Sequence, residues 1–201
     1  MKYLNKILIS AVFVFSFGSF TTSANACGTI TVAEMNWASA EMFAHVDKMI
    51  LENGYGCDVE LVPGDTMPTA TSMMEKGEPD VAPELWINSV RIALDNAVGE
   101  GRLHYAAEVL SDTGEEGWWI PQYMADANPD IQTVYDVLDR PDLFPHPEGG
   151  NGAIYTCPSG WNCQISTGNL FNAYGMEAKG FRLVDPGSGG ALAGSIAAAY
   201  N

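Results

Sequence analysis

Segments with the pattern of strands and segments with the pattern of helices alternate along most of this chain. Short runs of β-branched and apolar residues are typical of buried strands, and the segments between them have helical spacing and end at glycines. The predicted strands cover residues 29–33, 58–62 and 80–85, and the predicted helices cover 39–52, 66–76 and 88–98. This alternation predicts parallel strands joined by helices, which is the α/β class of fold.

The alternation is interrupted between residues 103 and 121. Short strands are predicted there, over 105–110 and 118–120, and we interpret the region as a crossover between two lobes with a hinge near Gly117. The pattern then resumes, with predicted helices at 133–138, 161–174 and 190–200, predicted strands at 153–156 and 181–184, and a loop at 145–152. We therefore expect two lobes, 27–116 and 117–201, each a doubly wound βα sheet.

The last predicted helix has no strand after it. A doubly wound lobe would continue with another strand, so we expect the first lobe to be incomplete and the chain to be truncated at its C-terminus.

Apolar residues recur at helical spacing in the predicted helix 39–52. They occupy positions i, i+1, i+4, i+7 and i+8, which predicts that this face of the helix packs on the core. These residues are Met42, Phe43, Val46, Met49 and Ile50.

The first 26 residues have the pattern of a secretion signal. Lys2 and Lys6 precede an apolar run over residues 7–20, and residues 24–26 form an Ala-Asn-Ala cleavage site. We expect a mature, periplasmic chain that begins at Cys27. A lipid anchor on Cys27 is the competing interpretation, but the residues before this cysteine do not match the leucine-containing motif of bacterial lipidation.

Four cysteines in an exported chain predict disulfides, and three pairings are possible. Proximity in the sequence favours Cys157–Cys163. The other two, Cys27 and Cys57, each precede a predicted strand and could face one another across neighbouring strands.

The segment 157–163 reads Cys-Pro-Ser-Gly-Trp-Asn-Cys, so a disulfide would close a short loop around Trp161. The same residues begin a predicted helix, whose first N–H groups are free to bind an anion. An indole beside such a helix start suits a ligand with a cationic end and an anionic end. The alternative is a structural clip around a core tryptophan.

Tryptophans follow three of the predicted strands. Trp37, Trp86 and Trp161 each stand between a strand and the next helix, and ligands of parallel α/β sheets bind at that end of the strands. Trp118 and Trp119 lie in the crossover, where one could face a cleft while the other packs. We expect these tryptophans to line a binding site.

Composition and motifs argue against several functions. The formal net charge of −16 disfavours nucleic acid as a partner. The three histidines are scattered and no Cys/His spacing matches a zinc motif, so we expect no metal and no cofactor. Sequence motifs of nucleotide binding or of hydrolase active sites are absent, and we expect a protein without enzymatic activity.

Four motifs together resemble the glycine betaine/choline/proline betaine substrate-binding proteins of ABC transporters. They are Ile30-Thr31-Val32-Ala33-Glu34-Met35-Asn36-Trp37, Gly54-Tyr55-Gly56-Cys57, Pro83-Glu84-Leu85-Trp86 and the loop from Cys157 to Cys163, and the resemblance covers the whole mature chain. It implies a two-lobed periplasmic binding protein of the type II-like kind, which delivers a quaternary ammonium ligand to a membrane permease.

The resemblance also implies roles for individual residues. Trp86 and Trp161 would form walls of an aromatic cage around the trimethylammonium group, and the backbone of Asn162 and Cys163 would hold the carboxylate. Trp37 matches an aromatic residue of the choline-binding branch. That branch has an acidic residue two positions later, where this chain has Ser39, which favours glycine betaine over choline.

The resemblance implies one more cage aromatic beyond Asn201, so we expect this chain alone to bind its ligand weakly. Two other functions remain as alternatives. One is a binding protein for a different small zwitterion, such as an amino acid, and the other is a secreted hydrolase.

Overall fold

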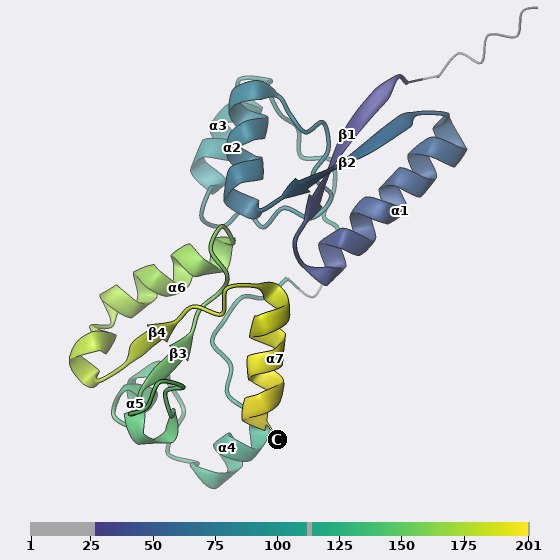
Figure 1. Cartoon of the computed structure of the whole chain (residues 1–201). Helices are drawn as coiled ribbons and strands as arrows, with labels where there is room; N and C mark the ends of the chain where they lie inside the picture. Colours follow the sequence, from purple (N-terminus) through teal and green to yellow (C-terminus); the bar gives the residue numbers. More distant parts are fainter. Residues whose placement is uncertain (1–26, 112–113, 201) are drawn as a thin grey trace, which may run out of the picture.

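The computed structural model describes residues 27–111 and 114–200 of the chain (Figure 1). The predicted signal peptide lies outside the described residues. Figure 1 shows two groups of elements: an N-terminal part with β1, β2 and α1 to α3, and a C-terminal part with β3, β4 and α4 to α7. Among the described residues, each part contains a parallel sheet of two strands. The chain therefore has a mixed α/β fold, as the alternating pattern predicts.

The N-terminal part begins with a βαβ unit. Strand β1 (Thr29–Met35) pairs along its whole length with β2 (Asp58–Gly64), and α1 (Ala38–Tyr55) connects them. Helix α1 is longer than predicted because it ends at Gly56, whose backbone is left-handed (φ 71°) and whose N–H binds the carbonyl of Glu52.

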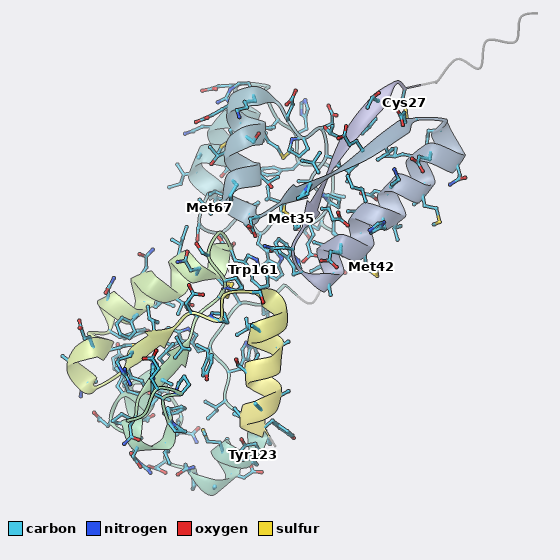
Figure 2. All side chains as sticks on the ribbon, viewed as in Figure 1. Cys27, Met35, Met42, Met67, Tyr123 and Trp161 are labelled. Atoms are coloured by element: carbon cyan, nitrogen blue, oxygen red, sulfur yellow. A yellow bond between two sulfur atoms is a disulfide. The ribbon has the colours of Figure 1, made fainter. Side chains whose placement is uncertain are left out.

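The prediction that the apolar face of α1 packs on the core is wrong. The side chains of Met42, Val46, Met49 and Ile50 are 37–57% exposed, and Figure 2 shows Met42 on the outer side of the helix. The buried positions are instead Ala40 and Ala44. A two-stranded sheet covers only a narrow stripe of a helix, and alanines let the helix backbone lie close to it.

The segment 80–85 is not the predicted strand. It contributes one bridge, in which Val81 pairs with β1 on the side opposite β2. Asp80 extends this contact, because its carboxylate accepts the backbone N–H and the hydroxyl of Thr31, both at 2.7 Å. The ladder stops there because Pro83 has no N–H to donate. Helices α2 (Thr66–Lys76) and α3 (Arg91–Gly99) lie on either side of this segment in the sequence.

The connection between the two parts, residues 100–121, contains no strand among its described residues, so the predicted strands 105–110 and 118–120 are wrong. Their apolar pattern lacks a partner strand: Tyr105 is 49% and Trp119 is 77% exposed. A short helix that the sequence pattern did not indicate, α4 (Gln122–Ala127), follows the connection.

The C-terminal part repeats the parallel arrangement on a smaller scale. Its strands are β3 (Ala153–Tyr155) and β4 (Arg182–Val184); its helices are α5 (Val134–Leu138), η1 (Pro141–Leu143), α6 (Asn162–Ala173), η2 (Met176–Lys179) and α7 (Gly189–Tyr200). Leu138, Met176 and Phe181 form its core. The predicted helices and strands of this part are present, and no bound differs by more than one residue.

None of the helices in the described part of the chain is long and apolar enough to cross a membrane.

The contact between Asp80 and Thr31 yields a test of the fold. Hydrogen bonds from the backbone and side chain of Thr31 lower the pKa of the Asp80 carboxyl, so the charged form stabilises the folded state. We expect Asp80→Ala to lower the free energy of unfolding by roughly 0.5–1 kcal/mol at pH 7, a small value because the pair is exposed. Denaturant unfolding followed by circular dichroism measures this.

A group with a lowered pKa contributes stability above its unfolded pKa of about 4, and that contribution disappears as pH falls through the folded pKa. The difference between Asp80→Ala and the parent should therefore shrink at about pH 2. Glu78→Ala, at an exposed position nearby, is the control. A difference that does not depend on pH would contradict the assignment to the carboxylate.

Candidate ligand-binding site

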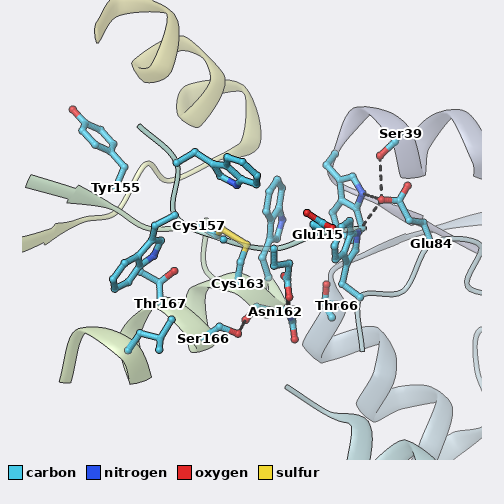
Figure 3. Close-up of a pocket in the computed structure, with 18 of the residues that line it drawn as sticks. Ser39, Thr66, Glu84, Glu115, Tyr155, Cys157, Asn162, Cys163, Ser166 and Thr167 are labelled. Atoms are coloured by element: carbon cyan, nitrogen blue, oxygen red, sulfur yellow. Dashed lines mark hydrogen bonds between the residues drawn. A yellow bond between two sulfur atoms is a disulfide. The ribbon is translucent and has the colours of Figure 1, made fainter. Parts of the chain in front are cut away.

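A cavity of about 640 Å³ lies between the two parts of the molecule (Figure 3). Its lining comes from strand ends and helix starts of the N-terminal part, from the connection, and from β3 and α6 of the C-terminal part. Every residue that the sequence predicts for ligand binding lines it: Trp37, Trp86, Trp118, Trp119, Trp161, Asn162 and Cys163. The structure thus brings together residues that are up to 126 positions apart in the sequence.

The indoles of Trp37 and Trp161 occupy equivalent positions, each between a strand and the helix that follows it. Trp37 stands two residues after the end of β1 and is the N-cap residue of α1, while Trp161 follows β3 and is the N-cap residue of α6. The carboxyl ends of parallel strands are where α/β proteins bind ligands. Trp86 reaches the cavity from the segment that follows the Val81 bridge.

Two indole N–H groups share one acceptor, the carboxylate of Glu84. Its Oε1 accepts Nε1 of Trp37 at 2.8 Å and Nε1 of Trp86 at 2.9 Å, and also the hydroxyl of Ser39 at 3.1 Å (Figure 3). Glu84 is 5% exposed. This residue belongs to the motif Pro83-Glu84-Leu85-Trp86, but the sequence pattern alone indicates no role for it.

The third indole is held by other contacts. The Nε1 of Trp161 donates to Oδ1 of Asn36 at 2.5 Å, and the ring of Trp161 lies edge-on to that of Trp37, with centroids 5.2 Å apart. Gly189, at the start of α7, lies so close that a Cβ atom there would be 3.1 Å from the Trp161 ring. Figure 2 shows Trp161 between the two parts.

More aromatic rings complete the lining. Trp118 and Trp119 both line the cavity, and Trp118 packs against Tyr174 with a centroid distance of 6.1 Å. Tyr155 and Tyr174 also line it, and sequence reasoning missed both. Tyr155 is the last residue of β3, so the rule that led to the tryptophans, an aromatic residue at a strand end, would have found it.

The loop before α6 is closed by a disulfide between Cys157 and Cys163, as predicted. Gly160 within it has a left-handed backbone (φ 95°), and its carbonyl accepts the N–H of Met67 at the start of α2, at 3.0 Å. This bond joins the loop to the N-terminal part. The N–H groups of Asn162 and Cys163 lie in the first turn of α6, where helix geometry provides no intrahelical acceptor.

The side chain of Asn162 also bridges the two parts, a role that sequence reasoning did not consider. Its Oδ1 accepts the backbone N–H of Ser89 at 2.6 Å, and its Nδ2 donates to the carboxylate of Glu116 at 3.0 and 3.2 Å. Asn162 is 2% exposed. These bonds fix the start of α6 relative to α3 and the connection.

The cavity has a negative character. Glu84, Glu115 and Glu116 line it, and its lining includes no lysine, arginine or histidine among the described residues. The three glutamates favour a ligand with a positively charged group. The pKa of the nearby Asp65 carboxyl is raised by burial, which outweighs the lowering effect of hydrogen bonds with Asn36 and Trp161. The described residues contain no cluster that could hold a metal ion.

The second predicted disulfide, Cys27–Cys57, is also present. It links Cys27, two residues before the start of β1, to Cys57, the residue before β2. The sulfur of Cys27 is therefore used in this bond, whereas lipidation would need the same sulfur as a thioether.

An aromatic cavity between two α/β parts is typical of a protein that binds a small molecule. Residues 28–201 match the family described as the substrate binding domain of ABC-type glycine betaine transport system (OpuAC), and the chain belongs to this family. Family membership implies that the chain is the substrate-binding component of an ABC transporter for compounds like glycine betaine, with a permease as its partner.

The chain is also similar to a protein of Chromohalobacter salexigens that is described as uncharacterized protein ORF1. The two are 26% identical over 145 residues, which make up 72% of this chain and 90% of that protein.

The two disulfides provide a chemical test of the site. Peptide mapping of the exported protein without reduction should recover Cys157 linked to Cys163 and Cys27 linked to Cys57. The same digest after reduction and alkylation is the control. Free thiols at residues 157 and 163, or a lipid-modified residue 27, would contradict the arrangement.

Proposed function

We propose that this protein is the periplasmic binding component of an ABC importer for glycine betaine or a close relative, and that it holds the ligand in an aromatic cage between two lobes. The observation that carries the proposal is that the indole N–H groups of Trp37, Trp86 and Trp161 all donate hydrogen bonds to protein oxygens. What these rings offer a ligand is therefore their carbon surface.

A carbon surface rich in π electrons suits a quaternary ammonium group. Such a group has no N–H, so it cannot be recognised by hydrogen-bond acceptors, and aromatic rings attract its charge while matching its apolar methyl groups. Each ring contributes about 0.5–2 kcal/mol when the contact is desolvated. The three carboxylates that line the cavity add long-range attraction for the cation.

The start of α6 suits the other end of a betaine. The free N–H groups of Asn162 and Cys163 and the positive end of the helix dipole together favour a carboxylate. The Cys157–Cys163 disulfide holds these groups beside Trp161, and both cysteines line the cavity. A ligand with a trimethylammonium group and a carboxylate two bonds away would contact both features at once.

The division into lobes at residues 27–116 and 117–201, with a hinge near Gly117, is part of the proposal. Gly117 lines the cavity within the connection. The hydrogen bonds that the N–H of Met67 donates to Gly160 and the N–H of Ser89 donates to Asn162 would then be contacts that form when the lobes close. A ligand that contacts both sides would shift the equilibrium toward the closed form.

We further propose export to the periplasm and the absence of enzymatic activity. The two disulfides support an oxidising compartment. No nucleic acid partner is expected, because the net charge is −16. Recovery of glycine betaine chemically unchanged after long incubation would support a binding protein over the secreted hydrolase.

A binding protein for another zwitterion, such as an amino acid, is the second candidate. The observation that favours it is Glu115, whose carboxylate lines the cavity and could accept the N–H groups of a primary ammonium. Titration with glycine betaine, proline betaine, choline and a set of amino acids separates the candidates. We expect betaines to bind more tightly than choline, because the hydroxyl of Ser39 is bonded to Glu84.

The cage proposal predicts the effect of removing one ring. Trp161→Ala should weaken glycine betaine binding at least tenfold, because about 1.4 kcal/mol corresponds to a factor of ten and the variant also removes the contact with Trp37. An NMR titration of the parent and the variant measures both dissociation constants, even when binding is weak.

Two variants control this experiment. Trp161→Phe keeps a ring and should lose less affinity, whereas Tyr105→Ala removes an exposed aromatic residue away from the cavity lining and should leave affinity unchanged. Equal affinity of the parent and a folded Trp161→Ala variant would rule out a role of this indole in the cage.

A further inference from the structure

We propose that Glu84 is the positioning residue of the cage: it fixes the indoles of Trp37 and Trp86 relative to one another and makes these rings selective for positive charge. This inference rests on the proposed function for its ligand, but its structural part concerns the ligand-free protein.

The geometry provides the first step. A single oxygen, Oε1 of Glu84, accepts the N–H groups of Trp37 and Trp86, which lie 49 positions apart in the sequence and on different segments. Each N–H lies at a fixed corner of its ring, so a shared acceptor restricts the rotation of both rings about their Cα–Cβ and Cβ–Cγ bonds. The hydroxyl of Ser39 holds the same oxygen from a third direction.

The other carboxylate oxygen shows that this arrangement has a cost. Oε2 of Glu84 is buried and has no hydrogen-bond partner among the described residues. Buried polar atoms are paired in most proteins, and an unpaired oxygen on a buried carboxylate is expensive. A glutamine would bind the same two N–H groups without a buried charge. The presence of glutamate suggests that the charge itself is used.

The charge acts on the cage in two ways. A carboxylate that accepts an indole N–H polarises the ring and raises the electron density of its π face, so a cation over that face is attracted more strongly. The carboxylate also attracts the cation directly through a region of low dielectric. Both effects depend on the ligand's charge and not on its shape, which distinguishes them from packing.

A purely structural role for Glu84 would make a different prediction. If Glu84 only supported the fold, its replacement would weaken by the same factor the binding of a carboxylate ligand with a cationic trimethylammonium group and of the same ligand with an uncharged tert-butyl group in that place. Glycine betaine and 3,3-dimethylbutanoate are such a pair, because the second carries a carbon atom in place of the ammonium nitrogen.

The first experiment uses the ligand-free protein, labelled with ¹⁵N, and observes the indole N–H signals by NMR. In Glu84→Ala, the signals of Trp37 and Trp86 should move upfield because they lose a charged acceptor. The signal of Trp161 should change little, since its acceptor is Asn36. Glu84→Gln keeps an acceptor and should give intermediate shifts, so it serves if the alanine variant does not fold.

The second experiment compares the two ligands. Glu84→Gln should weaken glycine betaine binding about tenfold and 3,3-dimethylbutanoate binding less than twofold. The dissociation constant of 3,3-dimethylbutanoate divided by that of glycine betaine should therefore shrink. Glu60→Gln, at an exposed position of β2 outside the cavity lining, removes the same charge and should leave the ratio unchanged.

The outcomes separate the two proposals. If glycine betaine does not bind the parent protein, the proposed function fails, and the indole signals still decide whether Glu84 positions the rings. If the signals of Trp37 and Trp86 do not move in either variant, the positioning role is overturned. If they move but both ligands lose affinity by the same factor, the charge selectivity is overturned.

Discussion

The cavity depends on where the parallel strands end. Strands β1 and β3 stop at Met35 and Tyr155, and the chain turns from each into a helix whose N-cap residue is a tryptophan. Because the strand ends of both parts face the same space, the two indoles meet in a T-shaped, edge-to-face contact, with centroids 5.2 Å apart. This geometry brings residues of both parts together. The Cys157–Cys163 disulfide closes the loop before α6, and the carbonyl of Gly160 and the side chain of Asn162 then link the two parts.

Within the cavity, the hydrogen bonds of the indoles decide what a ligand encounters. Glu84 and Asn36 bind the polar edges of three rings, so donors that could have attracted an anion are already used. The first turn of α6 adds backbone N–H groups that have no intrahelical acceptor. In the proposed binding mode, the aromatic surface contacts a cation and the backbone surface holds a carboxylate. The family to which the chain belongs is one of substrate-binding domains for glycine betaine transport.

Much of this could be predicted from the sequence, because strand ends are marked by local residues. A strand followed by a tryptophan and then by a helix start is visible in the chain at residues 29–38 and 153–162, and two cysteines six positions apart predict a closed loop. Helix α2 could be predicted with its observed bounds, since Lys76 and Gly77 have the pattern of a helix end.

What could not be predicted depends on contacts between distant segments. The buried stripe of α1 follows Ala40 and Ala44, because the width of the sheet, which no local pattern reveals, decides how much of the helix is covered. Segments with strand-like patterns, such as 105–110, have no neighbouring strand to pair with. The role of Glu84 depends on Trp37, 47 positions earlier, and a single glutamate in a motif carries no signal of such a contact.

In the proposed complex, the methyl groups of a quaternary ammonium ligand lie against three indoles. Intermolecular NOEs in the complex with glycine betaine measure this placement. We expect NOEs from the methyl protons to ring protons of Trp37, Trp86 and Trp161, together with an upfield shift of the methyl signal caused by the rings. A bound ligand whose methyl protons show NOEs to none of these three indoles would contradict the aromatic cage.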